Sequence, residues 1–252
     1  MIATGTRSLV PTIPSLAEAS YLTNESVFDL TALPRTLLVI GGGPFGCELA
    51  QAFCQFGART FSTHDEPLFL PKDEGDAAQM VSDALARDGV EIHLNRSVIG
   101  VRVEDGKKLV QTRSDGNLAS IAIDEISIGI GRTPAVSGLD LETADVLYDL
   151  ISGIRVDDFL RTTNPRIYSA SDVCVQHQFT DVADAAARIV VRNAPFLGRQ
   201  RVSARTIPQC TYTVRRSPMS ACTSSKRVSV AFPLRHSPCR CMTSTGRLPI
   251  ER

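Results

Sequence analysis

The chain has 252 residues, 43% of them hydrophobic and 21% charged, which is ordinary for a soluble globular protein that buries a core. Lys plus Arg and Asp plus Glu number 27 each, so the overall charge gives no reason to expect a nucleic-acid partner. No apolar run approaches the roughly 18 residues of a membrane-spanning helix, and the first residues lack a secretory signal pattern. The seven cysteines form no disulfide framework and no paired CxxC zinc pattern. We therefore expect a cytoplasmic protein without a metal site or a membrane partner.

The charge is divided unevenly along the chain. Residues 211–252 carry eight Lys or Arg and one acid, so this segment has a charge of +7 and residues 1–210 have −7. The segment is rich in Ser and Thr, and we find no helical or strand period in it. We therefore expect a disordered tail over 211–252 that does not continue the preceding fold.

Strand and helix patterns alternate between residues 36 and 130. They predict a buried parallel strand over 36–40, a helix over 47–53, a weaker strand over 58–62, a helix over 73–88 and a strand over 90–94. A hairpin over 98–104 and 108–113 turns at Asp105-Gly106, and one further strand is predicted over 120–130. This alternation predicts an α/β fold with a parallel sheet covered by helices.

A glycine pattern lies between the first predicted strand and helix: Gly41, Gly42, Gly43, Pro44, Phe45 and Gly46. In Gly41-x-Gly43-x-x-Gly46 the first glycine would allow a tight turn, and the second would let the backbone approach a pyrophosphate. The third would let the helix pack closely on the strand. The helix N-terminus would then face the phosphates with free N–H groups and its positive dipole end. The pattern predicts a dinucleotide site, and a purely structural glycine turn is the alternative.

An acid about 20 residues further on would hold the adenosine ribose in such a site. The expected position, at the end of the second strand, is His64, and Asp65 and Glu66 follow it directly. Arg59 is available to a 2′-phosphate, with a solvated strand residue as the plainer interpretation. The sequence therefore leaves the choice between NAD and NADP open.

Four segments carry a further pattern, in this order: Ala3-Thr4-Gly5-Thr6-Arg7 with Pro11, 41–48 (GGGPFGCE), 129–134 (GIGRTP) and 164–173 (NPRIYSASDV). Together they resemble motifs of the pyridine nucleotide-disulfide oxidoreductases, most closely the mercuric reductase and dihydrolipoamide dehydrogenase-like members. The resemblance implies a Rossmann-like parallel-sheet NAD(P) domain, residues 33–131, inserted in the remnant of a FAD-binding domain. That remnant would comprise residues 1–32, with the ATG motif, and the returning segment 132–210.

The resemblance also implies the cofactors and their contacts. Hydride would pass from NAD(P)H to FAD and then to a cysteine pair, which reduces a small-molecule or metal-ion substrate, and the family is homodimeric. The residues implied for the nicotinamide dinucleotide are the loop 41–46 with Glu48, His64, Val98 and Gly131. The residues implied for FAD are Thr4, Gly5, Thr6, Asp172, Phe179 and Thr180.

The chain departs from the family pattern at several points. Ser171 stands where the family has glycine before Asp172, and its Cβ would crowd the flavin. The first FAD glycine motif, the CxxxxC pair and the His-Pro acid/base are absent, and Cys47 and Cys54 are expected to pack as small apolar residues. No catalytic residue can be named. We therefore expect a fragment that is catalytically incomplete as given. The alternatives are a non-catalytic NAD(P)-binding fragment and an unstable truncated product.

The sequence after Thr213 differs from the family's D-P-E-x-A-x-V-G pattern and reads VRRSPMSACTSSKRVSVAFP. With a permissive choice of codons, the same DNA read one nucleotide earlier encodes PEIAHVGMYVKQARERGIP, which is the expected segment. We therefore hypothesise a frameshift near residue 213, with 214–252 translated out of frame. A basic nucleic-acid-binding tail is the rival interpretation, but the tail has no period and no interleaved aromatic residues.

Overall fold

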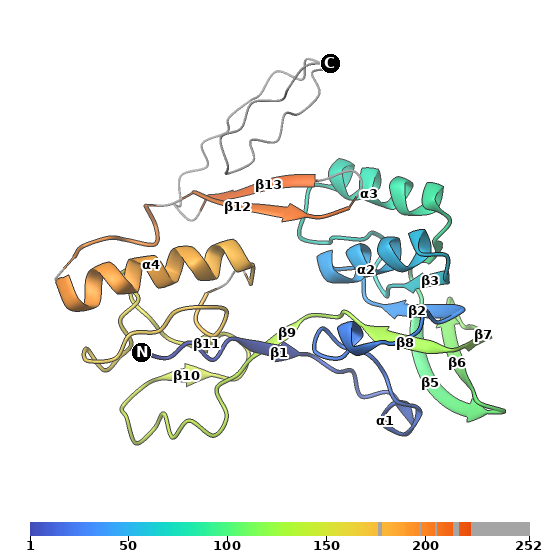
Figure 1. Cartoon of the computed structure of the whole chain (residues 1–252), viewed down its shortest axis with the longest axis horizontal. Coiled ribbons are helices and arrows are strands. Elements are labelled where there is room, and N and C mark those ends of the chain that lie inside the picture. Colours follow the sequence, from blue (N-terminus) through green and yellow to red (C-terminus); the bar gives the residue numbers. More distant parts are fainter. Residues whose placement is uncertain (176–177, 197, 205, 214–216, 223–252) are drawn as a thin grey trace, which may run out of the picture.

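A four-stranded parallel sheet, in the order β4-β3-β2-β8, forms the centre of the computed structural model (Figure 1). The structure describes residues 1–175, 178–196, 198–204, 206–213 and 217–222. The four strands are β2 (Thr36–Ile40), β3 (Arg59–Thr63), β4 (Glu91–His93) and β8 (Glu125–Ile128). Helix α2 (Pro44–Gln55) connects β2 to β3, and α3 (Gly75–Asp88) connects β3 to β4. The predicted α/β fold with a parallel sheet is confirmed.

The central strand β2 buries side chains on both faces of this sheet. Leu37 and Val39 pack in the cluster formed with α2 and α3. Leu38 and Ile40 point to the other face and pack in a second cluster. Burial on both faces explains why the strand is an uninterrupted apolar run in the sequence.

The sequence predicted a parallel sheet covered by helices, but α2 and α3 cover only one of its faces. The other face is covered by a three-stranded antiparallel sheet and the short helix α1 (Leu16–Ala19). Its strands are β5 (Ser97–Glu104), β6 (Lys107–Ser114) and β7 (Asn117–Ile123). The predicted hairpin at Asp105-Gly106 is confirmed, and both turn residues have a positive φ, 50° and 75°.

The prediction of a single strand over 120–130 was wrong, because the chain leaves one sheet and enters the other at Asp124. Its carboxylate Oδ2 accepts hydrogen bonds from the Thr36 N–H (2.8 Å) and hydroxyl (2.9 Å), and Lys107 forms an ion pair with it. The hydrogen bond from Lys107 is the main reason why the pKa of Asp124 is lowered to about 2. These contacts divide the run into β7 and β8.

The remaining elements join the start of the chain to the segment after residue 131. Strand β1 (Thr6–Ser8) pairs antiparallel with β9 (Arg132–Pro134). The other elements are the 3-10 helix η1 (Val27–Asp29), the paired strands β10 (Tyr148–Asp149) and β11 (Gly153–Ile154), and α4 (Thr180–Phe196). No helix in the described part of the chain is long and apolar enough to cross a membrane.

An antiparallel hairpin of β12 (Thr206–Thr211) and β13 (Ser217–Cys222) lies beside α2 and α4 (Figure 1). A disordered tail was expected from residue 211 onward, and β13 differs from that expectation. Strands pair through backbone hydrogen bonds, and these can form even where the sequence shows no alternation of apolar and polar residues. Residues 223–252 lie outside the described residues, and the frameshift stays a prediction.

Candidate functional site

Two glycines of the turn between β2 and α2 have no room for a side chain. Gly41 has a φ of 121°, and a Cβ there would lie 2.3 Å from the Gly129 carbonyl oxygen, just beyond β8. A Cβ on Gly46 would lie 2.2 Å from the Gly41 carbonyl oxygen. Since real Cβ atoms do not approach so closely, the turn and the helix–strand packing require glycine at both positions.

Gly43, in contrast, faces open space. Among the described residues, a Cβ on it would meet only the Gly129 carbonyl oxygen, at 3.8 Å, and its φ of −74° suits any residue. Gly43 is the N-cap of α2, Pro44 follows it, and no side chain caps the helix. The first backbone N–H groups of α2 therefore face the space above Gly43, which suits a pyrophosphate.

The loop after β3 packs against the glycine turn. A Cβ on Gly42 would lie 2.4 Å from the His64 ring and 2.7 Å from the Phe69 ring, and the Leu70 N–H donates to the Gly42 carbonyl (2.8 Å). The His64 and Phe69 rings stack with centroids 6.2 Å apart. Sequence reasoning placed His64 here but missed Phe69, for which no motif position gave a signal.

Arg59 lies at the amino end of β3, whereas the glycine turn lies at the carboxyl end of β2. Its Nε donates to Glu91 Oε1 (2.7 Å), and its guanidinium lies over the Phe61 ring. Ligands of parallel sheets bind beyond the carboxyl ends of the strands. The structure therefore separates Arg59 from the candidate site and supports the plainer interpretation.

Glu48 connects α2 to the end of the hairpin. Its Oε1 accepts a hydrogen bond from the Tyr212 N–H (2.8 Å), although 164 positions separate the two residues. Burial raises the pKa of Glu48, and the Tyr212 hydrogen bond opposes this effect. Spacing in the sequence gave no signal for this contact.

Val98 and Gly131 lie further from the turn in the chain. Val98, on β5, packs against the core on the antiparallel-sheet side. The carbonyl of Gly131, whose φ is 130°, accepts the Leu9 N–H (2.9 Å). Their contact with a dinucleotide stays a prediction.

Three of the motif segments meet at Thr6, Arg132 and Asp172. The Thr6 hydroxyl donates to Asp172 Oδ2 (3.3 Å), and Arg132 Nε donates to the Thr6 hydroxyl oxygen (2.5 Å). Arg132 also donates to the Thr6 carbonyl (3.1 Å), and its Nε lies 4.0 Å from Asp172 Oδ2. This cluster presents a half-buried carboxylate beside a cation, the type of donor and acceptor set that binds hydroxyl groups.

The other residues predicted to contact FAD lie in two places. The Thr4 hydroxyl donates to the Ala135 carbonyl (2.8 Å), and Gly5 has a φ of 68° with open space where a Cβ would be. Phe179 and Thr180 lie at the N-terminus of α4. Their role beside the cluster at Asp172 stays a prediction.

Ser171 occupies the position where the family motif has glycine, and it has a φ of 75°. Its hydroxyl is buried and makes no hydrogen bond within the described residues. The backbone here thus has the left-handed conformation that glycine tolerates best.

Three cysteines, Cys47, Cys54 and Cys174, have thiols that are harder to ionise than usual. Burial raises the pKa of Cys47 to about 12 and that of Cys174 to about 11, and it also raises the pKa of Cys54. Cys47 lies in the core, as predicted for a small apolar residue. Over the described ranges, no group of three or more His, Cys, Asp and Glu could hold a metal ion.

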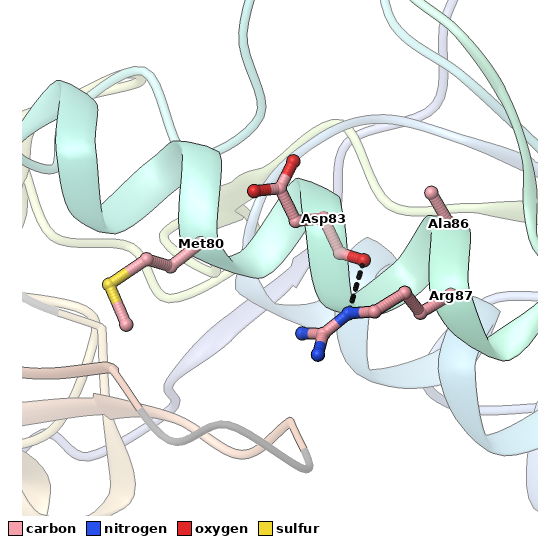
Figure 2. A pocket seen from close by; sticks show the side chains of 4 residues that line it. All are labelled: Met80, Asp83, Ala86 and Arg87. Carbon is pink, nitrogen blue, oxygen red and sulfur yellow. Dashed lines mark hydrogen bonds between the residues drawn. The ribbon is translucent and has the colours of Figure 1, made fainter.

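A hollow on the surface of α3 is separate from this site (Figure 2). Figure 2 shows that Met80, Asp83, Ala86 and Arg87 line it, and Arg87 Nε donates to the Asp83 backbone carbonyl (3.0 Å). All four residues lie on α3, and none belongs to the glycine turn. The hollow therefore has no part in the candidate site.

The parallel sheet, the closed glycine turn and the open helix N-terminus define an α/β protein of the dinucleotide-binding class. A family model described as pyridine nucleotide-disulphide oxidoreductase matches residues 1–188. The chain belongs to this family, and the resemblance stated from its motifs is confirmed.

The relatives are longer enzymes of the same family. The chain is 33% identical over 213 residues to a mercuric reductase of Bacillus cereus, covering 84% of this chain and 34% of the relative. It is 30% identical over 202 residues to the dihydrolipoyl dehydrogenase of Bacillus subtilis, covering 80% and 42%. The solved Cu(II) complex of the HOCl-induced flavoprotein disulfide reductase RclA from Escherichia coli has a TM-score of 0.78 at 30% identity, covering 87% and 50%. The chain thus spans between a third and a half of the length of these proteins.

Proposed function

We propose that the chain binds NAD(H) or NADP(H) at the Gly41–Gly46 turn and FAD beside Thr6 and Asp172, as part of a mercuric reductase-like flavoprotein oxidoreductase. The observation that carries the proposal is the contrast among three glycines. Gly41 and Gly46 have no room for a Cβ, whereas Gly43 faces open space beside the α2 N-terminus. A turn that served packing alone would not need the open position.

The bound cofactors would supply hydride transfer from the nicotinamide to the flavin. The chain's own residues would position them. The first N–H groups of α2 would hold the pyrophosphate, and the Asp172 carboxylate would accept hydrogen bonds from the flavin's ribityl hydroxyls. Arg132 and Thr6 would keep that carboxylate in place.

The final transfer to a disulfide or a metal ion needs a reactive thiol pair. None of the seven cysteines is in a Cys-x4-Cys arrangement, and burial raises the pKa of Cys47, Cys54 and Cys174. We therefore propose that the 252 residues hold the dinucleotide without completing substrate reduction. In that case the chain would act as a non-catalytic dinucleotide-binding module, because the turn is intact and burial disfavours the thiolates of Cys47, Cys54 and Cys174.

Isothermal titration of the full chain with NADH and NADPH tests the dinucleotide site. Gly43→Ala puts a methyl group into the open space and should lower the affinity about tenfold or more. Gly75→Ala is the matched control, because a Cβ there meets nothing within 4 Å and Gly75 begins another helix. Equal affinities in both variants and the parent chain would refute the site, provided that circular dichroism shows all three to be folded.

A further inference from the structure

The end of β4 supports the glycine turn of the proposed dinucleotide site through a series of hydrogen bonds. The Gly41 N–H donates to the Thr63 carbonyl (2.9 Å), and the His64 N–H donates to the His93 carbonyl (2.9 Å). The His64 carbonyl accepts the Arg96 N–H (2.9 Å), and the Thr63 hydroxyl donates to the Arg96 carbonyl (2.9 Å). A displacement at the end of β4 would therefore reach the turn that faces the pyrophosphate.

The His93 ring has surroundings that suit an uncharged group. It stacks on the Phe61 ring, with centroids 6.1 Å apart, and Phe61 is buried in the apolar cluster between the two sheets. The Nε2 atom of His93 is buried and makes no hydrogen bond within the described residues. In the charged form of histidine both ring nitrogens are donors. Protonation of His93 would therefore leave a buried N–H without an acceptor, which is costly.

The charged groups around His93 also disfavour a positive charge on it. Burial lowers the pKa of His93, and the nearby Arg96 lowers it further. Glu91, on the same strand, has the opposite effect, but its carboxylate already accepts a hydrogen bond from Arg59 Nε (2.7 Å) on β3. On β6, the group that the Arg96 guanidinium contacts is the uncharged Thr112 hydroxyl (3.3 Å). These surroundings favour the neutral ring near pH 7.

We propose that His93 is a proton-sensitive residue that weakens dinucleotide binding when the pH falls below about 6.5. Protonation places a second cation beside Arg96 and a buried donor without an acceptor, and both effects are relieved when the end of β4 moves away from β3. That movement removes the support that Thr63 and His64 receive. The proposal rests on the dinucleotide site at Gly41–Gly46 and adds a regulatory residue to it.

The same protonation makes the stability of the chain depend on pH. Because the pKa of His93 is lowered in the folded chain, the neutral ring contributes stability that is complete above the ordinary value of 6.5. This contribution is lost as the pH falls towards the lower folded value. The effect needs no bound dinucleotide, so it can be measured independently of the proposed function.

Isothermal titration of the full chain with NAD⁺ at pH 7.5 and pH 5.5 tests the proposal. The parent chain should bind NAD⁺ about fivefold or more weakly at pH 5.5. His93→Phe keeps a ring against Phe61 and cannot be protonated, so its affinities at the two pH values should agree within about twofold. If His93→Phe does not fold, His93→Gln replaces it, because a neutral amide also takes up no proton in this range.

Three variants of other titratable residues near the turn are the matched controls. His64 packs directly on the glycine turn, and burial raises the pKa of Glu48 and of Asp73. His64→Phe, Glu48→Gln and Asp73→Asn should each keep the loss of affinity at pH 5.5. If one of them abolishes the loss while His93→Phe keeps it, that other residue is the sensor and the proposal is overturned.

Urea unfolding of the parent chain and His93→Phe at the same two pH values separates this proposal from the one it rests on. The stability of the parent chain relative to His93→Phe should fall between pH 7.5 and pH 5.5. If it falls but the NAD⁺ affinity of the parent chain stays constant, the regulation is refuted and the dinucleotide site stands. If neither quantity changes with pH, His93 is not the sensor and the proposal is refuted. If the folded parent chain does not bind NAD⁺ at pH 7.5, both proposals are refuted.

Discussion

The Thr6 hydroxyl and the Asp172 carboxylate lie 3.3 Å apart although 166 positions separate them in the chain. The hydrogen bonds of Ile2 with Tyr168 and Ala170 bring their segments together, and the pairing of β1 with β9 brings the Arg132 side chain within reach of Thr6. The proposed flavin contact is therefore assembled from three distant segments. Its geometry depends on long-range pairing and not on any one motif.

Thr6→Val should lower the free energy of unfolding by about 1–2 kcal/mol. The hydroxyl both donates to Asp172 and accepts from Arg132, so its loss leaves two charged groups without their shared partner. Urea unfolding measures the effect. Thr4→Val is the control, because the Thr4 hydroxyl makes a single exposed hydrogen bond. Equal losses in the two variants would contradict a special role for Thr6.

Gly46→Ala should destabilise the chain by about 3 kcal/mol, because its Cβ would lie 2.2 Å from the Gly41 carbonyl oxygen. The strained contact is with backbone, which cannot move aside as a flexible side chain can. Gly75→Ala, on a helix without such a contact, should be close to neutral. Chemical denaturation of both variants compares them, and a neutral Gly46→Ala would show that the turn is looser than described.

Ser171→Gly should raise the free energy of unfolding by about 1–2 kcal/mol. Glycine relieves the φ of 75° and removes a buried hydroxyl that makes no hydrogen bond within the described residues. Ser15→Gly is an informative control, since Ser15 also has a left-handed backbone (φ 58°, ψ 17°) but is exposed. The difference between the two gains in unfolding midpoint isolates the buried hydroxyl. Equal gains would show that the hydroxyl costs nothing.

Asp124 should make stability depend on pH in the acid range. Its pKa is about 2 in the folded chain, below the ordinary 3.8, chiefly because Lys107 donates a hydrogen bond to it. A lowered pKa means that its stabilising contribution is complete above about pH 4 and is lost as the pH falls to about 2.

The stability difference between the parent chain and Asp124→Asn should therefore shrink between pH 4 and pH 2. Urea unfolding at pH 7, 4 and 2.5 measures it. Glu104→Gln, an exposed acid on β5, should show a small difference at every pH. A difference between the parent chain and Asp124→Asn that stays constant across this range would exclude Asp124 as the cause.

Sequencing the encoding DNA across codon 213 checks the frameshift hypothesis. A coding sequence that gives PEIAHVG when read one nucleotide earlier would support it. If the shifted reading matches no family segment, the frameshift hypothesis is excluded. The basic tail would then be a genuine part of the protein.

The sequence predicted those elements whose patterns are local. The strand at 36–40 and the helices at 47–53 and 73–88 were confirmed because apolar period and flanking glycines are enough to specify them. The break at Asp124 was missed because its partner Thr36 lies 88 positions away. The inward orientation of the His64 ring was also missed. It depends on contacts with Gly42 and Phe69, and no spacing rule links these residues to His64.

The position of β8 in the sheet also bears on the order in which the chain is completed during synthesis. Strand β2 pairs with β3 on one side and with β8 on the other, and β8 ends 88 residues after β2. At about 5–20 residues per second, the ribosome needs about 4 to 18 s to make that stretch. During this interval one edge of the most buried strand has no native partner, so this edge is where a nascent chain could pair with a neighbour.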